Sequence, residues 1–125
     1  MKTALVIEDN DDNMELIVII LESSGYGTIR AYDGLTGVRL ARADRPDFIV
    51  LDIQLPDILG MEVLKRIRDQ ELRFGTGPIP VIAMTSYAMS GDRERYLAAG
   101  CNGYIEKPID PEYVMEQIRG AIGES

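Results

Sequence analysis

The sequence predicts an α/β fold in which a doubly wound sheet of five parallel strands carries helices on both faces. Short β-rich runs alternate with helical patterns five times along the 125 residues, which is a usual length for one domain. Three of the runs are nearly all apolar, as expected of strands that are covered on both sides. Regular alternation implies right-handed crossovers through helices, so we expect a single domain over residues 1–125.

Apolar spacing and helix start and stop signals place the individual elements. Strands are expected at residues 4–7, 27–31, 48–51, 81–84 and 103–105. Helices are expected at residues 11–24, 33–44, 60–69, 90–99 and 110–122, with a loop at residues 74–78. Asp110 followed by Pro111 is typical of a helix start. Gly25 and Gly100 stand where helices are expected to end.

Composition and charge exclude several classes of function. The net charge of −8 argues against binding DNA or RNA, whose phosphates need basic partners. The chain has no histidine, which removes histidine bases, most zinc sites and any phosphohistidine of its own. No apolar run is long enough to cross a membrane, and the apolar run at residues 4–7 is too short for that of a signal peptide. There is one cysteine, Cys101. We therefore expect a cytoplasmic monomer without an internal disulfide.

The helix expected at residues 11–24 has apolar residues on more than one face. Glu15 and Glu22 lie together and mark its solvent side, with four apolar residues opposite them: Leu16, Ile17, Ile20 and Leu21. Met14, Val18 and Ile19 flank the two glutamates, where polar residues are usual. Two interpretations stay open: either the helix is deeply buried, or these three residues form an exposed patch on which a partner docks.

Polar and charged residues follow four of the expected strands. They are Glu8 and Asp9 after the first strand, Asp52 after the third, Thr85 after the fourth and Lys107 after the fifth. A doubly wound sheet brings the carboxyl ends of its strands to one edge. Each residue alone has an ordinary explanation, such as a helix cap or a surface charge. Together they predict one site.

The chemistry that fits this set is phosphoryl transfer to a carboxylate. Three carboxylates held together repel one another and raise one another's pKa values, and a divalent cation relieves this. Oxygen ligands suit Mg²⁺. Asp52 can attack phosphorus, Lys107 can neutralise the transferring oxygens, and Thr85 can donate a hydrogen bond to the phosphoryl group. A module that binds partners without turning over phosphate remains the alternative.

These motifs resemble those of the receiver domains of bacterial response regulators. The resemblance covers essentially the whole chain and rests on four segments, at residues 6–10, 51–60, 84–86 and 104–108. The segment at residues 88–92 is similar to receivers of hybrid histidine kinases and to stand-alone cell-division receivers of the DivK type. The resemblance implies a flavodoxin-like sheet with strand order 2-1-3-4-5 and five helices.

The resemblance also implies a role for each site residue. Glu8, Asp9 and Asp52 would bind Mg²⁺ with the backbone carbonyl of Gln54, and Asp52 would accept the phosphoryl group. Lys107 would contact the phosphoryl group, and Thr85 and Tyr104 would form a switch pair. The implied phosphodonor is a histidine kinase or a histidine phosphotransfer protein, and the implied output is binding to a downstream protein.

Hydrolysis of such an acyl phosphate requires that water reach the phosphorus. We expect Gln54 and Tyr87 to lie nearest that path, since they follow Asp52 and Thr85 by two residues each. Neither side chain is an acid or a base at neutral pH. Gln54 can orient a water molecule, and Tyr87 is expected to obstruct one.

Overall fold

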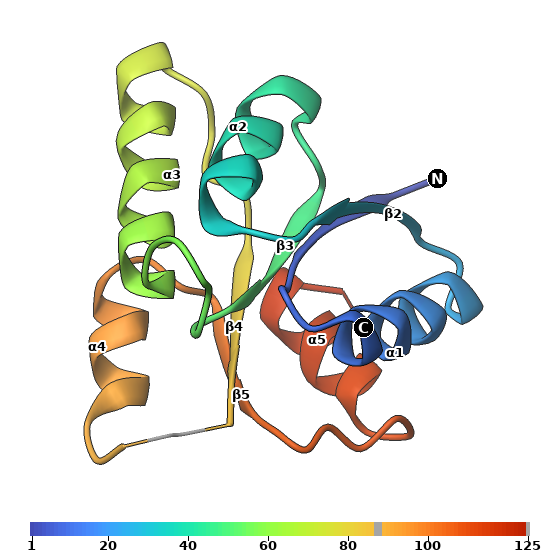
Figure 1. Ribbon diagram of the computed structural model, residues 1–125. Coiled ribbons are helices and arrows are strands. Elements are labelled where there is room, and N and C mark those ends of the chain that lie inside the picture. The colour runs from blue at the N-terminus through green and yellow to red at the C-terminus, as the bar shows by residue number, and fades with distance from the viewer. Residues whose placement is uncertain (87–88, 125) are drawn as a thin grey trace.

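Five parallel strands form one sheet in the computed structural model, which describes residues 1–86 and 89–124. Their order across the sheet is β2-β1-β3-β4-β5, so β3 is the central strand and β2 and β5 are the edge strands (Figure 1). The strands are β1 (Thr3–Ile7), β2 (Gly27–Ala31), β3 (Phe48–Asp52), β4 (Val81–Thr85) and β5 (Gly103–Glu106). The predicted fold class and strand order are confirmed.

The burial of the strands follows their apolar composition. Every residue of β3 and β4 is buried, and both strands have neighbours on either side in the sheet. The edge strand β2 is largely half-buried and carries the exposed Arg30. Pairing brings Asp52 beside Met84 and Thr85 beside Glu106, so the carboxyl ends of β3, β4 and β5 lie level. This alignment places the residues that follow these strands at one edge.

Helices cover both faces of the sheet, as Figure 1 shows. The helices are α1 (Asp11–Ser23), α2 (Gly34–Asp44), α3 (Gly60–Phe74), α4 (Asp92–Ala98) and α5 (Val114–Ile122). Residues of α1 and α5 share one hydrophobic cluster with the strands, and residues of α2, α3 and α4 share the other. Within the part of the chain described, no helix is long and apolar enough to cross a membrane.

α3, α4 and α5 differ most from the sequence prediction, whereas α1 and α2 differ from it by one residue each. α3 continues beyond residue 69 because the Glu71 carboxylate is buried, where it accepts hydrogen bonds from Arg68 and from the amide of Ile79. α4 is shorter than predicted at both ends. α5 begins at Val114, because Asp110 opens a turn in which its backbone oxygen accepts from the amides of Tyr113 and Val114. Gly25 and Gly100 have positive φ angles, so their predicted role at helix ends is confirmed.

The buried face of α1 corrects the prediction from the sequence. Met14, Ile17, Val18 and Leu21 are buried; they are spaced by three, four and seven residues, as one helical stripe requires. Val18 is 1% exposed, so the predicted docking patch of Met14, Val18 and Ile19 is wrong for its first two members. Ile19 is 57% exposed, and Leu16, expected in the core, is exposed beside it. The buried residues of α1 share one hydrophobic cluster with residues of β1 and β3, so the face of α1 that carries Met14 and Val18 is turned toward the sheet.

Candidate functional site

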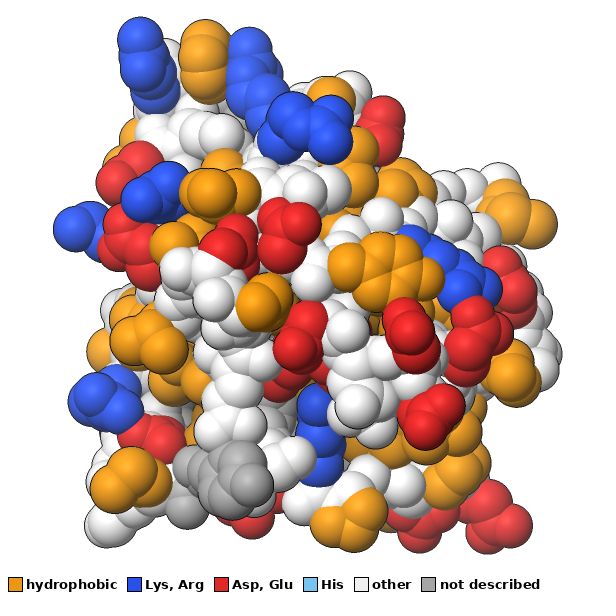
Figure 2. Space-filling view, in the orientation of Figure 1, with side chains coloured by type: hydrophobic (Ala, Val, Ile, Leu, Met, Phe, Trp, Pro, Cys, Tyr) orange, Lys and Arg blue, Asp and Glu red, His pale blue; other side chains and the backbone are white. Residues whose placement is uncertain are grey.

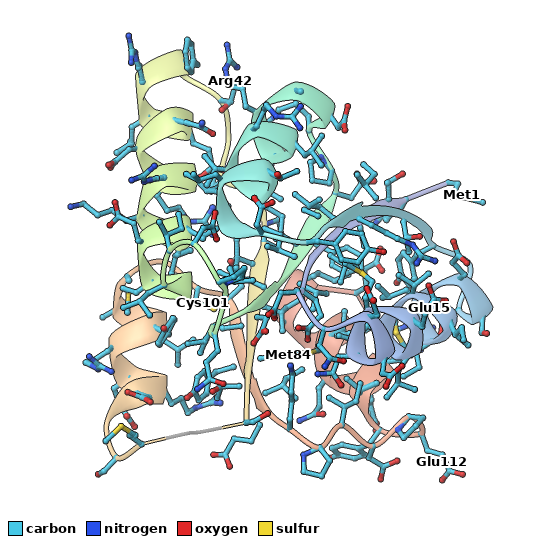
Figure 3. All side chains as sticks on the ribbon, viewed as in Figure 1. Met1, Glu15, Arg42, Met84, Cys101 and Glu112 are labelled. Atoms are coloured by element: carbon cyan, nitrogen blue, oxygen red, sulfur yellow. The ribbon has the colours of Figure 1, made fainter. Side chains whose placement is uncertain are left out.

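The predicted site residues meet at the carboxyl edge of the sheet. Glu8 and Asp9 directly follow β1, Asp52 is the last residue of β3, Thr85 is the last residue of β4, and Lys107 follows β5. Figure 3 labels Met84, the register partner of Asp52, and so locates this edge between α1 and α4. The backbone joins the strand ends further, because the amide of Lys107 donates to the carbonyl of Thr85 at 2.7 Å.

Lys107 bridges the two buried carboxylates of the site. Its Nζ donates to Oε1 of Glu8 at 2.7 Å and lies 3.6 Å from Oδ1 of Asp52. Glu8 is 1% exposed and Asp52 is 6% exposed, so solvent screens these charges little. The amide of Asn10 donates to the other oxygen of Glu8 at 3.2 Å, and the amide of Gln54 donates to Asp52 at 3.2 Å. Each buried acid therefore has a fixed orientation.

Asp9 completes a cluster that can hold a metal ion. Glu8, Asp9 and Asp52 each offer a carboxylate oxygen, and these oxygens lie within 4.8 Å of one another. Asp9 is exposed, whereas the other two acids are buried, so the cluster opens to solvent on the side of Asp9. An all-carboxylate set with one open side suits Mg²⁺, which prefers oxygen ligands and retains several waters. The donor set fits the metal that the sequence predicts.

The electrostatics of the site oppose full ionisation of its acids. Burial and the neighbouring carboxylate of Glu8 raise the pKa of Asp52 to about 7, and Lys107 opposes this rise only in part. Burial acts on Glu8 in the same direction, but its contacts with Asp52 and Lys107 hold the pKa of Glu8 below the usual value. One ammonium therefore compensates for one buried carboxylate. A second positive charge is needed for Asp52 to be a carboxylate throughout the neutral range.

The loop between β3 and α3 is held in place by two contacts. Gly60 approaches the loop so closely that a Cβ there would lie 2.6 Å from Cα of Ile53, which only glycine avoids. Asp57 accepts hydrogen bonds from the amides of Gly34 and Leu35, both at 2.8 Å, and so ties the loop to the start of α2. The sequence analysis missed Asp57, because its partners are more than 20 positions away and no local pattern reports them. Both contacts fix the backbone around Gln54.

Thr85 and Tyr104, the predicted switch pair, lie on the same face of the sheet. Tyr104 stands beside Ala83, two residues before Thr85 on β4. Both are buried, and the Tyr104 ring stacks on Tyr96 of α4 with 5.8 Å between ring centroids. The Tyr104 hydroxyl is buried without a hydrogen-bond partner among the described residues. Tyr87, the other predicted aromatic of this region, falls outside the residues that the structure describes.

Comparison with known proteins identifies the class of protein that this fold and site define. The chain belongs to the response regulator receiver domain family, whose model matches residues 4–119. Receiver domains are signalling phosphoacceptors of two-component systems rather than enzymes in the usual sense. The predicted family is thereby confirmed.

Individual relatives resemble the chain over nearly its whole length. It is 46% identical to the polar-differentiation response regulator DivK of Brucella anthropi, over 99% of this chain and 98% of that protein. The receiver domain of sensor histidine kinase PA1611 from Pseudomonas aeruginosa, solved with magnesium in its active site cleft, is 36% identical with a TM-score of 0.85; 98% of each chain is covered. The Ssk1 receiver of Saccharomyces cerevisiae, solved with the histidine phosphotransfer protein Ypd1, is 27% identical with a TM-score of 0.86, over 94% of this chain and 86% of that one.

Proposed function

We propose that the protein is a phosphorelay receiver in which Asp52 accepts a phosphoryl group from a phosphohistidine of a partner protein. The observation that carries this proposal is the buried pair of Glu8 and Asp52, which shares one ammonium and lies beside the exposed Asp9. Such an arrangement is costly for a merely structural role, since uncompensated buried charge destabilises a fold. It suits a site that receives a cation and a phosphoryl group together.

The chain's own residues account for the transfer step. An Asp52 carboxylate oxygen attacks phosphorus, forming an O–P bond while the N–P bond to the partner's histidine breaks. The imidazole leaves with the electron pair of that bond. Lys107, within 4 Å of Asp52, is placed to neutralise phosphoryl oxygens, and Thr85 at the end of β4 is placed to donate to one of them.

Glu8, Asp9, Asp52 and the backbone carbonyl of Gln54 are the residues that would hold Mg²⁺. When bound, the ion supplies the positive charge that allows Asp52 to ionise and that offsets charge on the transferring oxygens. The fixed loop around Gln54 supports this assignment, because Asp57 and Gly60 constrain its backbone. The assignment is also supported by the receiver of PA1611, which is 36% identical to this chain and was solved with magnesium in its active site cleft.

The signal would leave the site through Thr85 and Tyr104. A phosphoryl group that binds the Thr85 hydroxyl moves that side chain, and the buried Tyr104 ring can adjust into the space it leaves. One charge-assisted hydrogen bond contributes about 1.5–3 kcal/mol, whereas full switching from 1:99 to 99:1 needs about 5.5 kcal/mol. Repacking around Tyr104 and Tyr96 must therefore contribute the rest, and we expect partial activity before phosphorylation.

The phosphodonor would dock on the exposed part of α1 next to the acceptor. A cavity of about 110 Å³ lies between α1 and the segment after β5, lined by Asn13, Leu16, Ile17, Lys107, Pro108 and Ile109. Exposed Leu16 and Ile19 extend the apolar surface along α1. This surface replaces the predicted patch, of which only Ile19 is exposed.

The decisive experiment is labelling with acetyl phosphate and Mg²⁺, followed by intact mass measurement. Wild type should gain one phosphoryl group, and Asp52→Ala should gain none. Asp44→Ala, which removes an exposed acid at the opposite end of the sheet, is the matched control and should be labelled as wild type. If wild type stays unlabelled, the chain binds partners without turning over phosphate. Labelled Asp52→Ala would place the acceptor elsewhere.

Docking is tested by comparing two phosphodonors, a protein that must dock and a small molecule that need not. Ile19→Lys should slow transfer from a phosphorylated histidine phosphotransfer protein by about tenfold, about 1.4 kcal/mol, while labelling by acetyl phosphate stays unchanged. Val18→Lys should instead unfold the protein, because it places an ammonium at a buried position. Equal transfer rates for Ile19→Lys and wild type would remove Ile19 from the docking surface.

A further inference from the structure

A second surface with the features of a binding site lies at the opposite end of the sheet from Asp52. α2 and α3 leave a groove of about 500 Å³ between them, which is the size of many ligand-binding clefts and runs from Leu35 near the start of α2 to the C-terminal end of α3. We call it the arginine groove; its lining residues are Leu35, Val38, Arg39, Arg42, Asp69, Gln70, Arg73 and Phe74. Figure 2 shows Lys and Arg side chains gathered around hydrophobic atoms at this end, where Figure 3 labels Arg42.

The arginines of this groove have no acidic partners among the described residues. Arg39, Arg42 and Arg73 are exposed, and none of them takes part in an ion pair in the part of the chain described. The protein as a whole carries a net charge of −8, and acids outnumber bases by 21 to 13. Three unpaired guanidinium groups in one groove therefore run against the charge of the molecule. They provide positive charge that is free to meet an acidic ligand.

Phe74 arranges two of these arginines in advance. Its ring is 48% exposed, and the guanidinium carbon of Arg42 lies 3.4 Å from the ring centroid. The guanidinium of Arg73 lies 5.6 Å from the same centroid. A guanidinium stacked on an aromatic face keeps its in-plane N–H groups free for a carboxylate. The stacking also restricts the side chain before binding, which reduces the entropy lost when a ligand arrives.

The groove combines this charge with an apolar floor. Leu35 is exposed, and Val38 and Phe74 contribute apolar surface beside it. A small phosphate compound could pair with the arginines, but it would leave this floor in contact with water. Asp69 in the lining would also repel a dense polyanion. A protein segment with spaced carboxylates and an apolar side chain matches both features.

We propose that the arginine groove binds an acidic amphipathic segment of a partner protein, whose carboxylates pair with Arg39, Arg42 and Arg73 while an apolar side chain covers Leu35 and Phe74. The part of the groove that holds Arg42 and Arg73 lies where α2 leads into the amino end of β3, and Asp52 stands at the other end of that strand. A partner bound here leaves Asp52 and α1 free. The surface thus adds a contact that does not depend on the phosphoacceptor role of Asp52.

The test uses a fluorescein-labelled amphipathic peptide in which glutamates and leucines recur three or four positions apart, so that a helix presents both on one face. Fluorescence anisotropy should show saturable binding, and the peptide with glutamine in place of glutamate should bind at least about tenfold more weakly. A version with serine in place of leucine should also lose affinity, because the apolar floor then stays in water. Amide resonances should shift along the facing parts of α2 and α3 and not around Asp52.

Matched charge reversals separate a built groove from general attraction. The double variant Arg42→Glu with Arg73→Glu should lower affinity at least about tenfold. The double variant Arg30→Glu with Lys65→Glu has the same change in net charge outside the groove, and it should stay within about twofold of wild type. Circular dichroism checks that each variant is folded. Phe74→Ala removes the stacking surface without changing the net charge, and it should also lower the affinity for the peptide.

Several outcomes would overturn the proposal. Equal loss of affinity in the two double variants would mean that net charge alone attracts the peptide. Absence of binding at millimolar peptide would remove the groove as a peptide site. Inorganic tripolyphosphate that binds while the peptide does not would assign the groove to small phosphate compounds. Self-association lost in Arg42→Glu with Arg73→Glu, seen by sedimentation without any peptide, would assign it to a second copy of the chain.

Discussion

The two ends of the sheet hold unbalanced charge of opposite sign, and burial makes the two imbalances unequal. At the carboxyl end, the carboxylates of Glu8 and Asp52 are buried and share the single ammonium of Lys107. At the amino end, Arg39, Arg42 and Arg73 are exposed and unpaired among the described residues. Charge in water is stabilised by solvent, whereas buried charge must be compensated by neighbours. Only the carboxyl end therefore needs a cation for its own stability. At the amino end the unpaired arginines lower the stability of the fold little, even when no partner is bound.

Removing one cation from each end is the strongest test of this difference. Lys107→Met should lower the free energy of unfolding by about 3 kcal/mol at pH 8, because it leaves two buried carboxylates uncompensated. Arg42→Met should change it by less than about 1 kcal/mol, since Arg42 is exposed, pairs with no acid in the described chain and loses only its stacking on Phe74. Urea unfolding without Mg²⁺ measures both values. Similar losses in the two variants would contradict the assignment of the energetic difference to burial.

The pH dependence of stability sharpens the comparison. Asp52 has a pKa of about 7 in the fold and about 3.9 in an unfolded chain, so the folded state binds the extra proton between these values. Stability without metal should therefore fall as pH rises from about 4 to about 7. Asp52→Asn cannot ionise, and it should be more stable than wild type by about 4 kcal/mol at pH 8 and similar to wild type near pH 4.

The control for this experiment comes from the exposed acids. Asp44→Asn, at the end of α2, makes the same chemical change at an exposed position, and it controls for the substitution itself. Guanidinium unfolding at a series of pH values provides the measurement. A difference in the free energy of unfolding between Asp52→Asn and wild type that stays constant from pH 4 to pH 8 would mean that the fold does not raise the pKa of Asp52.

A smaller effect is expected from adding Mg²⁺, and it should depend on the carboxyl end alone. At a concentration about tenfold above its Kd, the ion should stabilise the fold by about 1.4 kcal/mol. Protons compete for Asp52 below its pKa of about 7, so the apparent affinity should be about tenfold weaker at pH 6 than at pH 8. Thermal unfolding should show this shift in wild type and in Arg42→Glu with Arg73→Glu, and lose it in Asp9→Asn with Asp52→Asn. A shift that persists in the second variant would place the ion elsewhere.

Much of the fold and the site could be predicted because the relevant signals are local. The apolar runs of β3 and β4 identify buried strands, and their alternation with helical patterns implies a parallel sheet. A parallel sheet in turn brings the ends of its strands to one edge, so Glu8, Asp52 and Lys107 could be grouped without coordinates. The sequence alone thus determined the fold class, the acid cluster and the family resemblance.

The tertiary structure decided what depends on neighbours distant in sequence. Met14 and Val18 are buried, and Leu16 is not, because of the way α1 packs against β1 and β3, and no spacing within α1 reports which of its apolar faces meets the sheet. Asp57 holds the start of α2, Glu71 is buried against Ile79, and Phe74 meets Arg42 from another helix. In each case the stabilising partner comes from a different segment. Local sequence sets which residues can be buried or paired, and only packing between segments selects the ones that are.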